Sequence, residues 1–313
     1  MTDVRSELRE GYAEVGHNIR LHYYEAGEGP LIVLLHGFPE FWYGWREQIS
    51  RLAAAGFRVV APDLRGYNLS SKPSGIAAYD TGPLAADIRD LIRDRSGQPA
   101  LVAGHDYGGT VAWALAMNHP EAVERLAILN AAHPRKLSQG LRNPAQLRKS
   151  WYFFYFQLPG IPERHVKSND WRFFRDFLGD ARPGSFTDED YKRYVDAWSQ
   201  PGAVTAMINY YRSSVRKSPR RAAAELRPVQ APTLVIWGQR DRYLGQELAE
   251  PDGKDVPHLD RVERLPDASH WVHHDEPERV NQLLTDFFAR PGRPGKRPGP
   301  QPRGSATRTG PEP

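Results

Sequence analysis

Short apolar runs alternate with segments of helical composition along the first part of the chain, and this alternation constrains the fold more than any other feature. Runs typical of buried strands lie at residues 31–35, 57–61, 100–103 and 126–129, after a first candidate strand at 19–24. Candidate helices lie between them at residues 45–55, 83–95 and 109–118. Strands that alternate with helices predict an α/β fold, in which a mostly parallel sheet is covered by helices on both faces.

The alternation stops between residues 131 and 230, where short helix-like segments rich in Trp, Tyr, Phe and Arg are broken by Pro and Gly. It resumes with apolar runs at 233–237 and 262–265. We therefore predict a core made of residues 1–131 and 230–290, and an inserted helical segment, here called the cap segment, at residues 132–229. Because this segment leaves after one core strand and returns before the next, we expect it over the carboxyl ends of the strands, where open α/β sheets bind ligands.

The formal net charge of +4 over 313 residues is concentrated at the C-terminus. Residues 291–313 contain five basic residues and one acidic residue, so the rest of the chain is close to neutral. A globular part without basic excess argues against nucleic acid as a partner. The same C-terminal segment is rich in Pro and Gly and cannot bury apolar surface, and it is predicted to be a disordered tail.

We expect neither membrane insertion nor cysteine chemistry in this chain. The first 15 residues lack an apolar stretch behind a basic start, and runs such as Leu31–Leu35 are far shorter than the roughly 18 residues of a spanning helix. The chain has no cysteine, which removes disulfides and thiolate metal sites and suits a reducing compartment. We expect a cytoplasmic protein.

Residues 101–109, Leu-Val-Ala-Gly-His-Asp-Tyr-Gly-Gly, lead from a candidate strand into a candidate helix. A sharp strand-to-helix turn that exposes a nucleophile needs small residues, because the backbones approach closely, and Gly104, Gly108 and Gly109 supply them. Asp106 takes the central place, which holds a serine in the usual pattern. The N-terminus of the helix favours the ionised carboxylate. The alternative is that Asp106 merely caps the helix.

The run Leu34-Leu-His-Gly-Phe-Pro-Glu40 ends another candidate strand. In enzymes with such a turn, the loop after this strand delivers a backbone N–H to the oxyanion hole. We predict the N–H of Phe38 as one donor and the N–H of Tyr107 as the second. A plain turn after a strand is the alternative for this motif.

A nucleophile of this kind needs a base that a third group orients. Asp241 follows the candidate strand at 233–237, and His270 follows the one at 262–265, which gives nucleophile, acid and base in the chain order of this pattern. A capping role for Asp241 and a structural role for His270 are the alternatives. His273 and His274 are rival bases, although they stand at the start of a candidate terminal helix.

Three motifs together resemble the epoxide hydrolases and dehalogenases of the α/β-hydrolase fold, and most of all the soluble epoxide hydrolases. They are His36-Gly-Phe-Pro-Glu40, Gly104-His-Asp-Tyr-Gly-Gly109 and Ala268-Ser-His-Trp271. The resemblance spans nearly everything before the tail. It implies the α/β-hydrolase fold with an inserted cap, and a hydrolase that needs neither metal nor organic cofactor. The implied partner is a small apolar epoxide or organohalide, and the oligomeric state stays open, with a homodimer as one alternative.

The chemistry of an aspartate nucleophile implies displacement at saturated carbon, because the resulting ester can be cleaved by water that His270 activates. An epoxide also needs an acid for its alkoxide. Residues 151–160 and 208–212 resemble the cap segments in which epoxide hydrolases present paired tyrosines, and Tyr152 and Tyr211 match these acids best. Packing alone is the alternative for both tyrosines. The substrate pocket is expected to include Trp151, Tyr155, Tyr210 and His36.

Two rival functions stay open from the sequence. A dehalogenase would use the same nucleophile, but a haloacid enzyme of this kind places arginines just after it, and Tyr107 and Thr110 stand there instead. A haloalkane enzyme usually has Trp directly after the nucleophile, a place that Tyr107 takes, although Trp151 could still serve a halide. A small-molecule binder without catalysis is the third reading.

Overall fold

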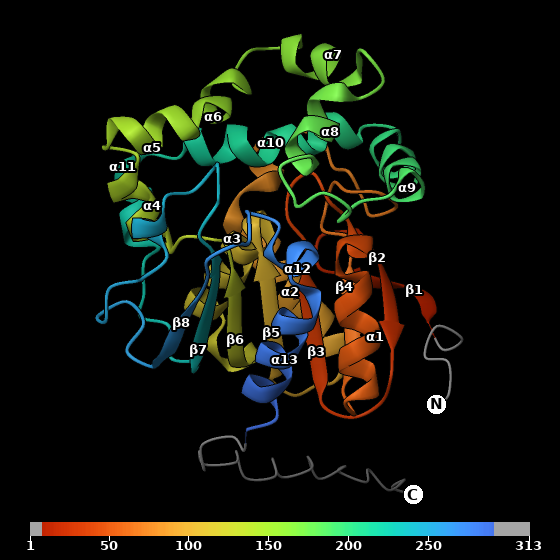
Figure 1. The fold of residues 1–313 in the computed structure, drawn as a ribbon, viewed down its shortest axis with the longest axis vertical. Coiled ribbons are helices and arrows are strands. Elements are labelled where there is room, and N and C mark those ends of the chain that lie inside the picture. Colours follow the sequence, from red (N-terminus) through yellow and green to blue (C-terminus); the bar gives the residue numbers. More distant parts are fainter. Residues whose placement is uncertain (1–7, 291–313) are drawn as a thin grey trace, which may run out of the picture.

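The computed structural model describes residues 8–290, and the predicted tail at 291–313 lies outside the described residues. Its centre is an eight-stranded sheet in the order β1-β2-β4-β3-β5-β6-β7-β8 (Figure 1). The strands are β1 (Arg9–Val15), β2 (Ile19–Ala26), β3 (Leu31–Leu35), β4 (Arg58–Pro62), β5 (Ala100–His105), β6 (Val123–Leu129), β7 (Thr233–Gly238) and β8 (Leu259–Leu265). From β4 to β8 all neighbours are parallel, while β1 pairs antiparallel with β2, and β2 with β4. The predicted α/β class and mostly parallel sheet are therefore confirmed.

Two pairs of helices cover the sheet. Helix α1 (Arg46–Ala54) packs beside α13 (Pro277–Phe288) in front of the sheet in Figure 1, and α2 (Thr81–Arg95) packs beside α3 (Asp106–Asn118) behind it. Every residue of β3 and β5 is buried as a result, which explains why both strands are continuous apolar or small runs without alternation. None of the described helices combines the length and the apolar character needed to cross a membrane.

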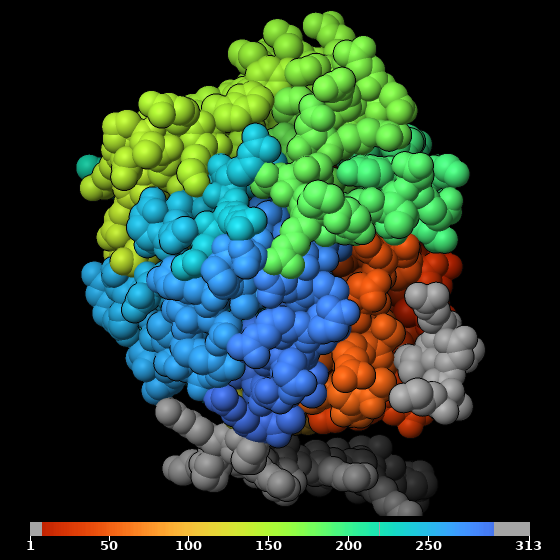
Figure 2. Space-filling view, in the orientation of Figure 1, coloured from red at the N-terminus to blue at the C-terminus, as the bar shows by residue number. Residues whose placement is uncertain are grey.

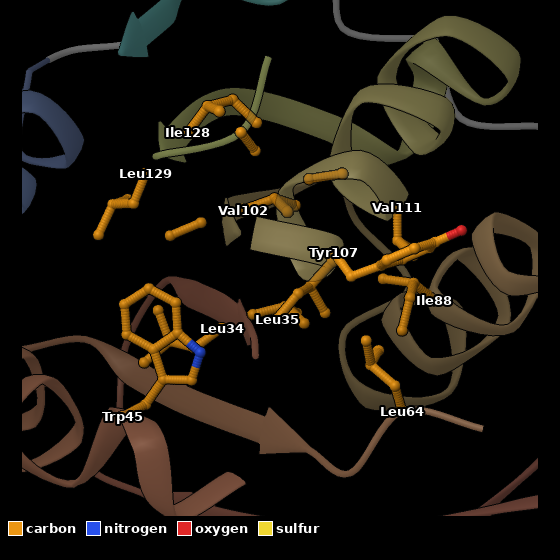
Figure 3. Close-up of a cluster of buried hydrophobic side chains, with 14 of the residues drawn as sticks. Leu34, Leu35, Trp45, Leu64, Ile88, Val102, Tyr107, Val111, Ile128 and Leu129 are labelled. Carbon is orange, nitrogen blue, oxygen red and sulfur yellow. The ribbon is translucent and has the colours of Figure 1, made fainter. Parts of the chain in front are cut away.

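The hydrophobic core lies between the central strands and these helices. Figure 3 shows Leu34 and Leu35 of β3, Val102 of β5, and Ile128 and Leu129 of β6 among the clustered side chains. Other members of the cluster come from the helices and loops on both faces: Trp45, Leu64, Ile88, Tyr107 and Val111. The core therefore anchors the strands whose carboxyl ends carry the predicted site.

The segment between β6 and β7 is helical and lies above the carboxyl ends of the strands, in yellow-green and green at the top of Figures 1 and 2. Its helices are α4 (Pro134–Gly140), α5 (Pro144–Lys149), α6 (Trp151–Tyr155), α7 (Ile161–Lys167), α8 (Arg172–Leu178), α9 (Asp188–Trp198), α10 (Ala203–Arg216) and α11 (Pro219–Ala224). Short 3-10 helices lie elsewhere, at Trp42–Trp45, Ala77–Tyr79, Pro120–Ala122 and Gln246–Leu248. All eight of these helices therefore lie between β6 and β7 in the sequence.

Strand β1 was not predicted, and its burial pattern explains the omission. The strand lies at the edge of the sheet, and only Ala13 and Val15 of its seven residues are buried. Its sequence therefore shows only a weak apolar pattern. His273 and His274 belong to the short helix α12 (Val272–Asp275), which precedes α13.

Candidate active site

Asp106 stands at a strained turn between β5 and α3. Its φ of 50° lies in the left-handed region, which a residue with a side chain rarely adopts. The glycines around it allow this close approach. A Cβ at Gly108 would lie 2.2 Å from the Leu35 carbonyl oxygen, and one at Gly104 would lie 2.5 Å from the Gly108 carbonyl oxygen. The carboxylate is thereby raised above the end of the sheet, where its side chain is 15% exposed.

The Asp106 carboxylate faces two groups that the sequence analysis assigned to the site. Its Oδ1 accepts a hydrogen bond from the Phe38 N–H at 2.8 Å, and its Oδ2 lies 3.3 Å from His270 Nε2. Helix α3 begins without a side-chain cap, so its N-terminus does not hold the carboxylate in a capping bond. The geometry therefore favours a nucleophile over a helix cap. Tyr107, the other predicted donor, is the second residue of α3.

Behind His270, Asp241 orients the ring. Asp241 Oδ2 lies 2.7 Å from His270 Nδ1, and its Oδ1 accepts from the backbone N–H groups of Tyr243 and Leu244 at 2.7 and 2.8 Å. Burial raises the pKa of Asp241, but the charge of His270 and the hydrogen bonds from His270, Asn130 and Leu244 outweigh it and hold that pKa below its usual value. Burial likewise lowers the pKa of His270, but Asp241 and Asp106 outweigh it and raise the pKa to about 10. The two neighbouring carboxylates therefore favour the cationic form of the imidazole.

Two further residues hold this arrangement, and sequence reasoning missed both. Asn130, just after β6, donates from Nδ2 to Asp241 Oδ2 at 2.7 Å and accepts the Gly238 N–H at 2.9 Å. His105, the last residue of β5, donates from Nε2 to the His270 carbonyl oxygen at 3.0 Å. The sequence signal that could have identified them is a polar residue at the carboxyl end of a buried strand. This signal is clearest at Asn130, which directly follows an apolar run.

Tyr152 of α6 and Tyr211 of α10 lie opposite Asp106. Both line a cavity of about 70 Å³ together with Asp106, and their ring centroids are 5.5 Å apart. Their side chains are 4% and 2% exposed, and burial together with the Asp106 charge raises the pKa of each hydroxyl well above its usual value. Within residues 8–290, neither hydroxyl takes part in a hydrogen bond, so both are available to a molecule in the cavity.

The other tyrosines nearby have their hydroxyls engaged. Tyr210 donates to the Arg65 carbonyl oxygen at 2.6 Å, and Tyr107 to the Tyr210 carbonyl oxygen at 2.7 Å. The Tyr155 hydroxyl lies 2.7 Å from His165 Nδ1 on the outer side of the cap segment. Tyr210 and Tyr155, which the sequence analysis put in the substrate pocket, do not line the cavity at Asp106 because α6 and α10 turn them away from it.

The remaining two predicted pocket residues also lie outside this cavity. Trp151 is 51% exposed and lines an outer cleft, because it stands on the solvent face of α6. His36 is fully buried below the site, where its Nε2 accepts the Leu64 N–H at 2.9 Å. Trp151 therefore lies in the outer cleft and not in the cavity beside Asp106. His36 makes a structural hydrogen bond below the site and does not contact the cavity.

The rival bases contact a different carboxylate. His274 Nε2 lies 2.7 Å from Glu40 Oε1, and His273 Nε2 lies 3.4 Å from Glu40 Oε2. Among the described residues, one group has the atom types and spacing of metal ligands, and it consists of Glu40, His105 and His273. Their candidate ligand atoms all lie within 4.8 Å of one another. Asp106, Asp241 and His270 are not part of it.

The chain is similar to several known proteins. A family model described as alpha/beta hydrolase fold matches residues 30–277. The chain is 47% identical over 278 residues to the AB hydrolase superfamily protein YfhM of Bacillus subtilis (strain 168), covering 87% of this chain and 95% of that one. It is 38% identical over 279 residues to Epoxide hydrolase 4 of Homo sapiens, covering 86% and 76%. A crystal structure of Bacillus megaterium epoxide hydrolase in complex with an inhibitor matches with a TM-score of 0.80 and 32% identity, covering 90% of this chain and 100% of that one.

Proposed function

Because this chain belongs to the α/β-hydrolase fold family, we propose that it hydrolyses epoxides to vicinal diols through an ester on Asp106. The single observation that carries the proposal is the pair of unengaged hydroxyls on Tyr152 and Tyr211, which share a cavity with Asp106. A nucleophile opposite two acids suits a three-membered ring that must be attacked at carbon and protonated at oxygen.

In the first step, an Asp106 carboxylate oxygen attacks a ring carbon. A carbon–oxygen ester bond forms, and the ring carbon–oxygen bond breaks. The leaving oxygen stays on the substrate as an alkoxide and takes a proton from Tyr152 or Tyr211. The high pKa of both phenols keeps them protonated beforehand, and an alkoxide is still the stronger base. The Phe38 N–H donates to Asp106 Oδ1, whereas Oδ2 lies beside His270.

Formation of the ester also prepares the second step. Asp106 loses its negative charge when it is alkylated, which removes one of the two carboxylates that raise the pKa of His270. The imidazole then gives up a proton more easily, reprotonates the tyrosine, and becomes a neutral base. Asp241 keeps the ring oriented throughout.

In the second step, His270 takes a proton from water, and the hydroxide attacks the carbonyl carbon of the ester. The oxyanion of the tetrahedral intermediate is held by the Phe38 N–H and the Tyr107 N–H. Collapse of the intermediate breaks the bond between the carbonyl carbon and the ester oxygen, and the leaving alkoxide takes the proton of the new carboxylic acid. This releases the diol and restores the Asp106 carboxylate, which keeps one oxygen of the water. The new oxygen of the first diol therefore comes from Asp106 and not directly from water.

An epoxide fits the described residues better than a halide does. A leaving halide needs N–H donors, and among the described residues no tryptophan lines the cavity at Asp106. Tyr152 and Tyr211 instead supply protonated hydroxyls that can donate to an alkoxide, and a leaving halide does not require such a proton.

The test combines a product screen with isotope labelling. Styrene oxide and 1-chlorobutane are each incubated with the enzyme, and diol and chloride are measured. We expect diol from the epoxide and no chloride release. In a single turnover in ¹⁸O-water, we expect the label in the Asp106 peptide and unlabelled diol. Chloride release would favour a dehalogenase, turnover of neither compound nor of other epoxides would favour a binder, and ¹⁸O in the first diol would exclude the ester.

A further inference from the structure

A large cleft opens on the outside of the cap segment, close to the candidate active site but separate from its cavity. The cleft has a volume of about 830 Å³ and is formed by α5, α6, α7, α8 and the segment that follows β7. In Figure 2, blue residues of the core rise between the yellow-green and green parts of the cap segment. Four cationic side chains line it, Arg148, Lys149, Arg172 and Arg242, against one acid, Asp176. We call it the basic cleft.

The charge of the basic cleft is only partly neutralised. Arg172 pairs with Asp176 at 3.6 Å, but both side chains are largely exposed, so the pair is weak. Arg242 pairs with Asp180 at 3.2 Å. Lys149 donates to the Asp241 carbonyl oxygen at 2.9 Å, which carries no net charge, and Arg148 forms no ion pair with a described carboxylate. The cleft therefore keeps an excess of positive charge.

Aromatic rings form the inner wall of the basic cleft, and this wall is one ring thick. Phe177 and Tyr243 both line the cleft and stack on each other, with centroids 5.2 Å apart and planes 6° apart. The same Tyr243 ring lies 5.2 Å from the His270 ring, and the same Phe177 ring lies 5.4 Å from the Tyr152 ring. A ligand in the basic cleft is thus separated from the catalytic groups by a single pair of side chains.

The cavity beside Asp106 is small, so the groups that separate it from the basic cleft bear on how a larger substrate can bind. A cavity of about 70 Å³ holds an oxirane and little more, so the remainder of any larger substrate must extend beyond it. We propose that substrates reach Asp106 from the basic cleft, past Phe177 and Tyr243, and that the cleft selects epoxides that carry an anionic group, such as a carboxylate, at the end remote from the ring. This inference rests on the proposed epoxide hydrolysis and names its substrate class.

The physical basis is attraction between the anionic end and the excess positive charge. Cationic clefts raise the local concentration of anions and speed their association by about tenfold or more, and salt screens the effect. The aromatic wall would contact the apolar middle of the same molecule. Recognition of charge at the cleft and chemistry at Asp106 then act on opposite ends of one substrate.

A matched pair of substrates tests this. The glycidyl ether of 4-hydroxybenzoate and that of 4-hydroxybenzamide have nearly the same shape, and only the first is an anion at pH 7.5. We expect kcat/KM to be about tenfold higher for the carboxylate at low salt, with the ratio falling towards one in 0.5 M NaCl. The variant Arg148→Gln/Arg172→Gln should bring the ratio close to one at low salt.

The control variant is Arg164→Gln/Arg216→Gln, which removes the same charge from exposed positions of the cap segment that do not line the cleft. It should keep the ratio of the wild-type enzyme. Equal kcat/KM for the two substrates in the wild-type enzyme, or the same loss of ratio in both variants, would overturn the proposal.

The failure of this inference can be told apart from failure of the proposed function. Hydrolysis of the amide alone already supports the proposed function, whatever the ratio. If neither ether is hydrolysed, the cleft is tested by calorimetry with unreactive 4-propoxybenzoate. Binding that is weakened by Arg148→Gln/Arg172→Gln, but not by the control variant, would support an anion site. Absent or unchanged binding would exclude it.

Discussion

His270 Nε2 lies 3.3 Å from Asp106 Oδ2, while the other ring nitrogen lies 2.7 Å from Asp241. One imidazole thus bridges the proposed nucleophile and the residue that orients it. The proposed chemistry needs this contact only after Asp106 has reacted, because attack on the epoxide uses the carboxylate and hydrolysis uses the base. The two steps can therefore be separated by mutation.

The variant His270→Gln should form the ester and fail to hydrolyse it. Alkylation needs the Asp106 carboxylate, which the variant keeps, while activation of water needs the imidazole. Intact mass spectrometry after incubation with styrene oxide should show one added substrate mass, located on the Asp106 peptide. Asp106→Asn in the same experiment is the control and should show none. An unmodified His270→Gln protein, under conditions in which the wild-type enzyme turns the compound over, would contradict the mechanism.

Removing the cap hydroxyls should slow opening of the ring. Tyr152→Phe and Tyr211→Phe each delete one acid but keep the buried ring, so we expect a fall in the alkylation rate of roughly a hundredfold for the double variant and less for each single variant. Stopped-flow measurement of the first turnover reports this rate. Tyr155→Phe is the matched control, since its hydroxyl contacts His165 on the outside of the cap segment. Full activity in the double variant would remove both tyrosines from the acid role.

Asn130→Ala should weaken both the fold and the site. The substitution removes the buried hydrogen bonds that Asn130 makes with the Asp241 carboxylate and with the N–H and carbonyl oxygen of Gly238, and it leaves these partners buried. We expect a loss of about 2–4 kcal/mol in the free energy of unfolding, measured by urea titration. Asn118→Ala, at a surface contact with Arg227, is the control and should change stability little. Stability equal to that of the wild-type protein would show that water replaces the Asn130 amide.

The raised pKa of His270 predicts how stability depends on pH. The folded value is about 10 and the value in an unfolded chain is near 6.5, so between these values the folded state binds more protons. The stabilisation from the charged ring is therefore complete below about pH 6.5 and is lost as the pH rises through about 10. Urea unfolding of the wild-type protein and of His270→Gln at pH 6, 8 and 10 should show the difference between them shrinking as the pH rises. A constant difference would indicate that the pKa is not raised.

Local patterns in the sequence were enough to predict the buried strands of the sheet and the sharp turn at Asp106. Continuous apolar runs such as Leu31–Leu35 reflect burial on both faces, and the glycines at 104 and 108 are needed wherever a strand bends this sharply into a helix. Both signals depend on residues a few positions apart. Strand β1 was not predicted, because an edge strand buries too few side chains to need a continuous apolar run.

Which side chains meet across the site was decided only by tertiary structure. Tyr152 and Tyr155 share one short helix, yet the packing of α6 over the core directs the first towards Asp106 and leaves the second bonded to His165. Asn130 reaches Asp241 across 111 positions of sequence. Spacing along the chain determines the face of one element, whereas the partner of that face depends on how elements distant in sequence pack, and no local pattern encodes that packing.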